Sequence, residues 1–321
     1  MVHVERVGPD TVIAASRVLR ESFPLPCPDY SPEYLRWQLS FPGRNSSIAV
    51  AAFDGQEMVG FAAATPRPIR FQQVASECFI VSFVAVRPHW RGQGVAADLY
   101  SELLAVVRQT TAPILTFASP NSPGQRSLHR AYEVAQIPIR KLGRYPVFGS
   151  PLSLVTRNAS TWGVQESNSA EFIHALETCS ENDTISANPN SAVLDHYARD
   201  PRPRKLVALT DPGGEPAGAA MIVCSELRTG TGIERVRTID FLACCNRDIE
   251  SWKAVIEFAR QQWPQNVSND AVMLTNVRCS DFLTRRNAGV RQVSIGVEGY
   301  IGTSNGDSSF VSATGTNLEV I

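Results

Sequence analysis

Residues 76–109 read SECFIVSFVAVRPHWRGQGVAADLYSELLAVVRQ, and the fold of the chain follows from this stretch. Residues 76–86 are almost wholly apolar, which predicts a buried strand. Residues 95–109 place apolar side chains at helical intervals, which predicts an amphipathic helix. Between them lie Gly92 and Gly94, which permit a tight turn. A buried strand that turns directly into a helix is typical of α/β architecture.

The neighbouring segments extend this unit in both directions. Two short helices come first, the second with Ser31 as a candidate N-cap. Asp54-Gly55 then separates two apolar runs, which is a strong hairpin signal. The segments PILTFASP, GQRSLHRAYEVAQ and RKLGRYPVF follow and predict a strand, a helix and a closing strand. The predicted order is two helices, a hairpin, a strand, a loop, and then helix, strand, helix, strand.

The same order of segments recurs after residue 160. Helices SAEFIHALETC and SAVLDHYARD lead to the hairpin KLVALTDPGGEPAGAAMIVC, the apolar strand TIDFLACC and the helix SWKAVIEFARQQW. Gly60 and Ala85 are 25 residues apart, and so are Gly218 and Ala243. This spacing predicts a tandem duplication of one α/β unit. Two unrelated halves that share an order are the alternative.

The sequence therefore predicts an α/β (α+β) fold with two tandem units, each a mixed central sheet flanked by helices. We expect a first domain at 1–155, a second at 156–303 and a C-terminal tail at 304–321.

Composition excludes several classes of function. The 321 residues include 30 Lys+Arg and 31 Asp+Glu, so no basic excess is available for nonspecific nucleic-acid binding. No apolar run approaches the roughly 18 residues that cross a bilayer, and the start lacks a secretory signal, so we expect no membrane segment. The seven cysteines are scattered and indicate free thiols in a reducing, cytoplasmic setting. The five histidines stand apart, so no metal site is expected.

The turn between strand and helix, Arg91 to Ala96, carries the strongest chemical signal. Backbone N–H groups at a helix N-terminus bind anions, and two glycines let the backbone approach a pyrophosphate. Arg91 adds positive charge. The turn lacks the GxxxxGK[ST] pattern, and no acidic residue completes a GxGxxG dinucleotide fingerprint. By itself it could equally be a turn that only joins strand to helix.

The wider segment VAVRPHWRGQGVAADLYSEL resembles the acetyl-CoA motif of the GNAT superfamily of N-acyltransferases. Arg91, Gly94 and Ala96 fill the three defined positions, and Val86 and Pro88 form the lead-in. The resemblance implies acetyl-CoA or a longer acyl-CoA as co-substrate and two GNAT-like units. The residues that it implies for CoA binding are Val86, Arg91, Gly92, Gln93, Gly94, Val95 and Ala96.

The second half lacks this loop. After Cys245 it runs NRDIESWK, without glycine and with Asp248 and Glu250 near the helix start, where they would repel a pyrophosphate. We therefore expect only the first half to bind CoA and the second to serve acceptor binding.

A narrower resemblance covers most of the chain. DYSPEYLRWQLSFPG, MVGFAAATP, the CoA loop region, VLDHYARDP, DFLTRRNAGV and VEGYIG look like successive segments of the eukaryotic N-myristoyltransferases, which are tandem GNAT folds. The resemblance implies that the backbone amides of Phe83 and Val84 polarise the thioester carbonyl. It also implies that the terminal carboxylate of Ile321 removes a proton from the amine. Alternatively, the tail is only polar and disordered.

Three departures leave the substrate open. The loop that covers the peptide in that family is cut to PLPCP, the expected glycine-aspartate-glycine turn is absent, and Ser82 stands where the family has asparagine. Acyl chain length and glycine-peptide specificity are therefore not decided by the resemblance.

Four further side chains are candidates. Tyr132 occupies a position where many GNAT enzymes place a tyrosine that protonates the leaving thiolate, although it could be a core residue. His129 matches a His-Arg pair near the peptide site of the myristoyltransferases, or is a surface residue. Glu77 and Asp98 are carboxylates that could replace the tail as base, or be solvated.

These features predict an acyl-CoA-dependent N-acyltransferase that moves an acetyl or longer group to a primary amine by direct attack. The acceptor would be a peptide N-terminus or a small amine, with amino-sugar N-acetylation as one alternative. A non-catalytic CoA-binding sensor is the alternative from another class. The oligomeric state is left open.

Overall fold

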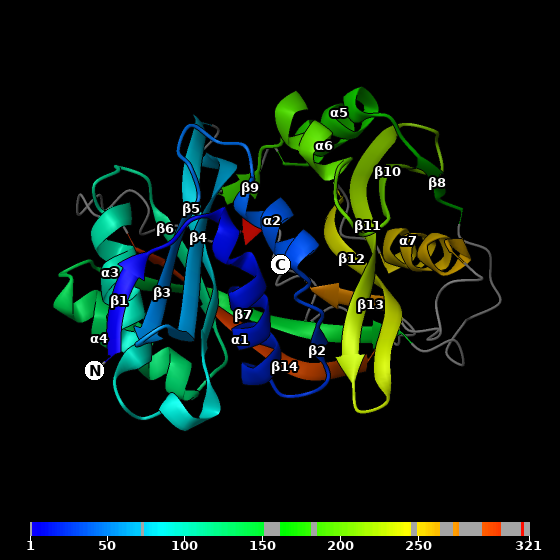
Figure 1. The fold of residues 1–321 in the computed structure, drawn as a ribbon. Coiled ribbons are helices and arrows are strands. Elements are labelled where there is room, and N and C mark those ends of the chain that lie inside the picture. Colours follow the sequence, from blue (N-terminus) through cyan, green and yellow to red (C-terminus); the bar gives the residue numbers. More distant parts are fainter. Residues whose placement is uncertain are drawn as a thin grey trace. The chain divides into compact units, whose positions relative to one another are not determined.

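The computed structural model describes residues 2–71, 74–150, 161–180, 185–244, 249–263, 272–275, 291–302 and 316–317. The chain divides into two compact units (Figure 1). Unit 1 comprises residues 1–69, 75–143 and 297–313, and unit 2 comprises residues 70–74, 144–296 and 314–321.

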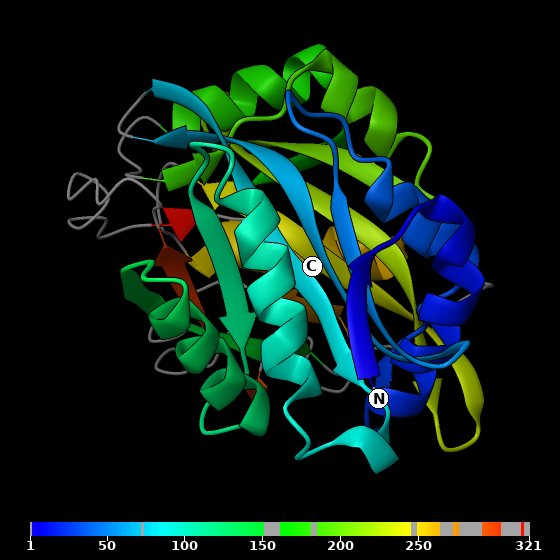
Figure 2. The same cartoon turned by 60° about the vertical axis from the view of Figure 1, so that its left-hand side comes forward.

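Unit 1 contains six successive strands of the sheet, with helices on both faces. Its elements are β1 (Val2–Arg6), η1 (Pro9–Thr11), α1 (Val12–Ser22), β2 (Cys27–Pro28), α2 (Pro32–Leu39), β3 (Ile48–Asp54), β4 (Glu57–Phe71), β5 (Val74–Val86), η2 (Pro88–Trp90), α3 (Val95–Val107), β6 (Ile114–Ala118) and α4 (Pro123–Val134). The strands follow the order β1-β3-β4-β5-β6-β14, in which β14 spans Arg291–Gly302. α3 and α4 lie on one face of this sheet, and α1 and α2 on the other (Figure 1, Figure 2).

Local sequence explains most of these elements. α2 begins after Ser31, whose hydroxyl accepts a hydrogen bond from the Tyr34 N–H at 3.1 Å, with a proline in its first turn. The β3–β4 hairpin turns at Gly55, where φ is +58°. β1 was not predicted. It is a half-exposed edge strand that pairs antiparallel with β3 over Val2 to Arg6, and its short alternating pattern is weak without that partner.

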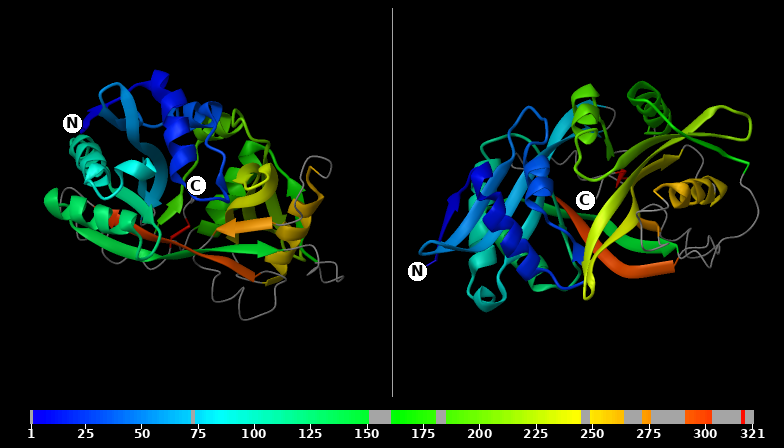
Figure 3. Two further views of the ribbon diagram at one scale, coloured as in Figure 1. Left: turned by 60° about the horizontal axis from the view of Figure 1, so that its bottom comes forward. Right: turned by 45° about the vertical axis from the view of Figure 1, so that its right-hand side comes forward.

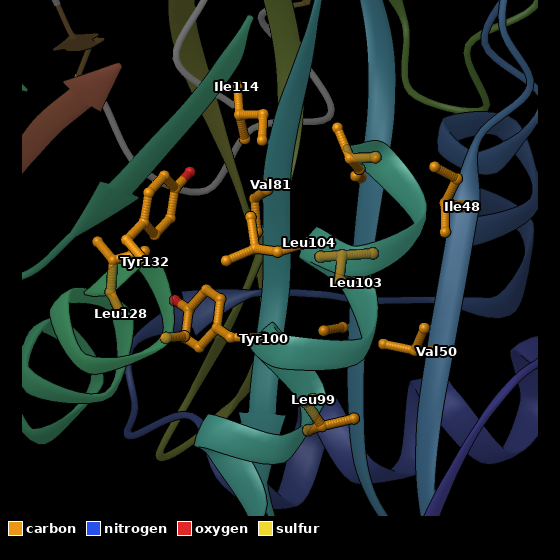
Figure 4. Close-up of a cluster of buried hydrophobic side chains, with 14 of the residues drawn as sticks. Ile48, Val50, Val81, Leu99, Tyr100, Leu103, Leu104, Ile114, Leu128 and Tyr132 are labelled. Atoms are coloured by element: carbon orange, nitrogen blue, oxygen red, sulfur yellow. The ribbon is translucent and has the colours of Figure 1, made fainter. Parts of the chain in front are cut away.

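The core of unit 1 lies between the sheet and helices α3 and α4 (Figure 4). It is lined by aliphatic side chains and includes Tyr100, Tyr132 and Tyr300. Tyr300 comes from β14, which pairs antiparallel with β6 from Glu298↔Ala118 to Gly302↔Ile114. A strand from the end of the sequence thus completes the sheet of the first unit.

Unit 2 has a comparable plan. Its elements are β8 (Gly163–Glu166), α5 (Ser169–Ser180), β9 (Ile185–Ala187), α6 (Ser191–Tyr197), β10 (Arg204–Thr210), β11 (Pro216–Thr229), β12 (Gly232–Cys244), α7 (Ile249–Gln261), β13 (Val272–Thr275) and β15 (Thr316–Asn317), and its sheet begins with the second part of β7 (Ile139–Ser150). The order is β7-β13-β12-β11-β10-β8. α7 packs against one face, and α5 and α6 lie on the other (Figure 3).

The predicted fold class is confirmed: each unit has a mixed central sheet flanked by helices. In each, one parallel pair follows a strand–helix–strand connection, β5 with β6 and β12 with β13. A Cβ on Gly60 would lie 3.3 Å from the Ala85 carbonyl oxygen, and one on Gly218 would lie 2.8 Å from the Ala243 carbonyl oxygen. In both units the glycine therefore lies where neighbouring strands approach closely, and the tandem duplication stays a prediction.

Candidate active site

The two parallel strands at the centre of unit 1 share only a short ladder. β5 and β6 pair at Phe79↔Ile114, Ile80↔Leu115 and Val81↔Thr116. β5 runs on to Val86 and β6 to Ala118 without further pairing between them. Main-chain groups of β5 beyond Val81 that face β6 are therefore available to a ligand that extends beside the strand.

Directly after the last rung, β5 carries a bulge at Phe83. Its φ is +60°, a left-handed value that is rare for a bulky residue. Before the bulge, Phe79 and Val81 face the α3 side of the sheet, whereas after it Val84 and Val86 do. One extra residue has therefore shifted the alternation of the strand. Such a conformation costs on the order of 1–3 kcal/mol and persists only where surrounding contacts impose it.

The turn after β5 is shaped by two left-handed glycines. Gly92 has φ +81° and Gly94 φ +89°, and a Cβ on either would meet nothing within 4 Å. Gly94 is the N-cap of α3, and its carbonyl accepts from the N–H groups of Ala97 and Asp98 at 2.8 and 3.1 Å. Within the described part of the chain, no carbonyl accepts from the N–H groups of residues 92–96. These amides, at the positive end of α3, form a site for an anion.

The side chain of Arg91 braces this corner from within. Its Nε donates to the Val86 carbonyl at 3.1 Å, and its guanidinium also donates to the Ser22 carbonyl at the end of α1. The side-chain amide of Gln93 donates to the His89 carbonyl at 3.0 Å. Arg91 thus contributes charge to the corner while its donors hold main-chain atoms in place.

Tyr132 lies at the level where the β5–β6 ladder ends. It is fully buried on α4, and its hydroxyl is 2.9 Å from Oγ1 of Thr116, the partner of Val81 in the last rung. Figure 4 shows the ring among aliphatic side chains, beside Val81 and Leu128. Burial raises the pKa of Tyr132 well above its usual value, so the phenol keeps its proton at neutral pH.

His129 is placed differently. It is exposed on α4, and its ring meets Tyr300 edge-on at 5.0 Å between centroids. Tyr300 also accepts a hydrogen bond from Gln125. His129 therefore lies against Tyr300, which pairs with Thr116 in the middle of the β14–β6 ladder. Its role in acceptor binding stays a prediction.

Two of the candidate bases, Glu77 and Asp98, lie in the described part of the chain. Glu77 accepts hydrogen bonds from the Arg44 and Asn45 N–H groups at 2.7 and 3.2 Å, so its carboxylate holds that loop. Asp98 is exposed in the first turn of α3. Ile321, the predicted base, lies outside the described residues, as does Asp248 in the second unit.

Two features beside Phe83 were missed from the sequence. The Ser82 hydroxyl oxygen is shielded from solvent and has no hydrogen-bond partner in the part of the chain that the structure describes. A buried polar atom without a partner is costly, which suits a place where a ligand supplies one. The rings of Tyr30 and Tyr34 also contact Phe83. The segment DYSPEY was the available signal for these rings, but periodicity does not tell which strand a ring will meet.

Two further searches concern the same described residues. None of their helices is both long and apolar enough to cross a bilayer. No group of three or more His, Cys, Asp or Glu among them is arranged to hold a metal ion.

Comparison with known proteins places this site in context. Residues 13–133 match the model of the acetyltransferase (GNAT) family. No curated protein matches the sequence. Two solved structures share the fold. A GCN5-related N-acetyltransferase from Anabaena variabilis is 14% identical with a TM-score of 0.61, over 98% of this chain and 75% of that one. Saccharomyces cerevisiae N-myristoyltransferase with bound myristoyl-CoA is 12% identical with a TM-score of 0.64, over 94% and 82% of the two chains.

Proposed function

We propose that this chain, whose residues 13–133 match the GNAT family model, is an acyltransferase that moves an acyl group from acyl-CoA to a primary amine by direct attack. The observation that supports this most is the junction of three features in unit 1: a strand edge without a ladder, a bulge at Phe83, and a helix N-terminus with unused amides. A thioester cofactor with a diphosphate needs all three.

The fit of CoA follows from the chemistry of these groups. The N–H groups of Gln93, Gly94, Val95 and Ala96 would bind the diphosphate, with Gly92 shaping the turn. The pantetheine arm, which carries amides, would lie along the free edge of β5 up to Val86. The thioester carbonyl would then reach the bulge, where the amides of Phe83 and Val84 would stabilise the developing oxyanion.

Acyl transfer then needs two proton movements. A base removes a proton from the ammonium acceptor, the neutral amine attacks the carbonyl carbon, and the carbon–sulfur bond breaks. We propose Tyr132 as the donor to the departing thiolate, because its hydroxyl lies beside Thr116 at the last rung of the ladder. The proton that the newly acylated nitrogen loses would replace the one that Tyr132 gives up, so CoA leaves as the thiol. We propose the Ile321 carboxylate as base. This proposal rests on the resemblance to the N-myristoyltransferases.

The acceptor class is the less constrained part of the proposal. The whole-chain likeness to an N-myristoyltransferase favours a peptide N-terminus, and His129 would then lie on the acceptor side. The likeness to a GCN5-related N-acetyltransferase supports a small amine or an amino sugar with acetyl-CoA. Acceptor binding by unit 2 stays part of the proposal.

Calorimetry and thiol release test this function together. The intact chain is titrated with acetyl-, decanoyl- and myristoyl-CoA and then assayed for free thiol with a glycine-initiated peptide, a polyamine and an amino sugar. We expect binding and turnover with at least one pairing. Binding without thiol release from any pairing would instead identify a CoA-binding sensor, and absence of binding would exclude both.

Removal of the last two residues tests the base separately. If the terminal carboxylate acts as base, kcat falls about 100-fold or more while acyl-CoA affinity is unchanged. An unchanged kcat would show that another group removes the proton.

A further inference from the structure

The bulge at Phe83 needs a structural cause, because its own sequence does not favour it. Phe83 is neither glycine nor asparagine, yet its φ is +60°. Its ring is 8% exposed and lies outside the α3–α4 core to which its neighbours in β5 belong. The contacts of this ring are therefore what can hold the main chain in a left-handed conformation.

Two tyrosines enclose the ring of Phe83. Tyr30 meets it edge-on with 5.9 Å between ring centroids and an interplanar angle of 87°. Tyr34 meets it with 6.4 Å and the same angle of 87°. Edge-to-face pairs at these separations are favourable beyond the area that they bury. Both tyrosines come from the segment that leads into and begins α2.

The two tyrosines are themselves fixed by polar contacts. The hydroxyl of Ser16 on α1 donates to the Tyr30 carbonyl at 2.6 Å. The amide of Gln38 donates to the Tyr34 hydroxyl at 2.9 Å, and its oxygen accepts from Arg67 on β4 at 2.7 Å. Arg67 and Gln38 are both buried. A chain of contacts thus runs from β4 through α2 to the bulge, so the rings have little freedom to move away.

The end of α1, which precedes this segment, contacts the C-terminal end of β5 and the residues after it. Arg87 forms an ion pair with Glu21 at 3.0 Å, and Arg91 donates to the Ser22 carbonyl. Phe23, the next residue, packs on Tyr30 with 5.3 Å between centroids. The connection between α1 and α2 therefore follows β5 from Phe83 to the CoA-binding corner.

We propose that Tyr30 and Tyr34 are positioning residues whose rings hold Phe83 in its left-handed conformation and thereby aim the Phe83 and Val84 amides at the thioester carbonyl. This inference rests on the proposed function of those amides. It assigns the α1–α2 connection a part in oxyanion stabilisation, in addition to any part in acceptor binding.

The test compares ring removal with hydroxyl removal. Tyr30→Leu and Tyr34→Leu remove one aromatic wall each, whereas Tyr30→Phe and Tyr34→Phe keep the ring. We expect each leucine variant to lower kcat about tenfold, with the KM for acyl-CoA changed less than about twofold. Tyr30→Phe should retain nearly the full kcat. Tyr34→Phe keeps the ring but loses the hydrogen bond from Gln38, so its kcat should lie between those of the unaltered chain and Tyr34→Leu. In the double variant Tyr34→Leu/Phe83→Leu, the Phe83→Leu change should lower kcat little further, because the contact between the two rings is already lost.

A spectroscopic readout makes the test independent of the acceptor. Acetyl-CoA carrying ¹³C at the thioester carbonyl is bound to each variant, and the carbonyl stretch is followed by infrared difference spectroscopy. The unaltered chain should shift the stretch to lower wavenumber, and the leucine variants should return it towards the value of free acetyl-CoA. Phe53→Leu is the matched control, because it removes the His3–Phe53 stack at 5.6 Å on β3, away from β5.

The outcomes separate this inference from the proposed function. Leucine variants that bind acetyl-CoA with unchanged affinity, carbonyl stretch and kcat would overturn the positioning role alone. Loss of the carbonyl shift in Tyr30→Phe would also overturn it, because this variant keeps both the ring and the Ser16 contact to the main chain. Tyr30→Phe tests the idea even where a leucine variant does not fold. Failure of the unaltered chain to bind acetyl-, decanoyl- or myristoyl-CoA would overturn the proposed function and this inference with it.

Discussion

The β5–α3 corner of unit 1 and the β12–α7 corner of unit 2 join the same kinds of element in the same order. In unit 1 the joint contains Gly92 and Gly94, both left-handed, and leaves amides without acceptors. In unit 2 the sequence offers no glycine there, and Glu250 in the first turn of α7 pairs with Lys253 at 2.6 Å. The α/β fold therefore requires only a loop that connects the strand to the helix. Anion binding also requires residues in left-handed conformations and a first helical turn without acidic side chains.

The largest effect is expected from breaking the unit 1 corner with Gly94→Glu. The substitution forces a side chain into a left-handed position and adds a negative charge beside the diphosphate, so acyl-CoA binding should be lost in calorimetry. Gly214 is a matched control, because its φ is +88° and a Cβ there also meets nothing within 4 Å. Gly214→Glu should have a similar conformational cost and unchanged CoA affinity. Equal affinity in both variants would contradict the assignment of the corner.

A second substitution asks whether unit 2 affects CoA binding at all. The Asp200 carboxylate is fully buried and contacts Arg202 and Arg204 at 2.9 and 2.6 Å. Asp200→Asn should lower the free energy of unfolding by about 3 kcal/mol, because it removes the buried negative charge that both guanidinium groups contact. CoA affinity of the folded protein should not change. Denaturant titration and calorimetry measure the two quantities, and a parallel loss of affinity would show that CoA binding depends on unit 2.

The same carboxylate sets a pH dependence. Burial alone would raise the pKa of Asp200, but the hydrogen bond from Arg202 and the charge of Arg204 outweigh it, so the pKa lies below its usual 3.8. Since a depressed pKa stabilises the folded state above the unfolded value, this contribution is present above pH 3.8 and is lost as the pH falls through the lowered pKa. In Asp200→Asn this part of the acid dependence should disappear.

Substitution of Gly60 or Gly218 by alanine compares how closely the strands approach in the two sheets. In unit 1 the Cβ of Gly60→Ala would lie 2.9 Å from Leu99 Cδ1, the end of a flexible side chain, and 3.3 Å from the Ala85 carbonyl oxygen. In unit 2 the Cβ of Gly218→Ala would lie 2.8 Å from the Ala243 carbonyl oxygen, which cannot move without the strand. We expect losses of stability of about 1 and about 2 kcal/mol respectively. A larger loss for Gly60→Ala in thermal unfolding would reverse this ranking.

The smallest effect is expected for Arg91→Lys. A lysine ammonium cannot span the Val86 and Ser22 carbonyls as the guanidinium does, although it keeps the charge. Acyl-CoA affinity should fall by about fivefold, or about 1 kcal/mol, because the corner is less firmly held. Arg235→Lys, at a half-exposed pair with Glu226 in unit 2, is the matched control and should bind acyl-CoA normally. A wild-type affinity for Arg91→Lys would show that charge alone matters there.

Some parts of this protein could be predicted because their signal is local. The long apolar run to Val86, the amphipathic helix after it and the glycines between them carry their own periodicity and turn chemistry. The likeness to the GNAT superfamily rested on the same residues, and the match of the family model over residues 13–133 confirms it. The roles of Tyr132, His129 and Ile321 stay predictions, because they depend on where a substrate lies.

Other parts could not be predicted because they depend on residues far apart in the sequence. Tyr300 joins the core of unit 1 although it lies near the C-terminus, since β14 pairs with β6. The carboxylate of Glu77 appears free in the sequence but is occupied by the 44–45 loop. Neither pairing has a local pattern, because strand partners are selected by packing across the sheet.

The sequence by itself determined the order of the main helices and strands and the place of the anion-binding turn, because periodicity and glycine act over a few residues. Only the tertiary structure decided that Phe83 takes a left-handed conformation and that Tyr30 and Tyr34 enclose its ring. A phenylalanine in an apolar strand has no local reason to leave the extended conformation. The contacts that outweigh this preference come from α2 and the residues just before it, and they form only when the chain is folded.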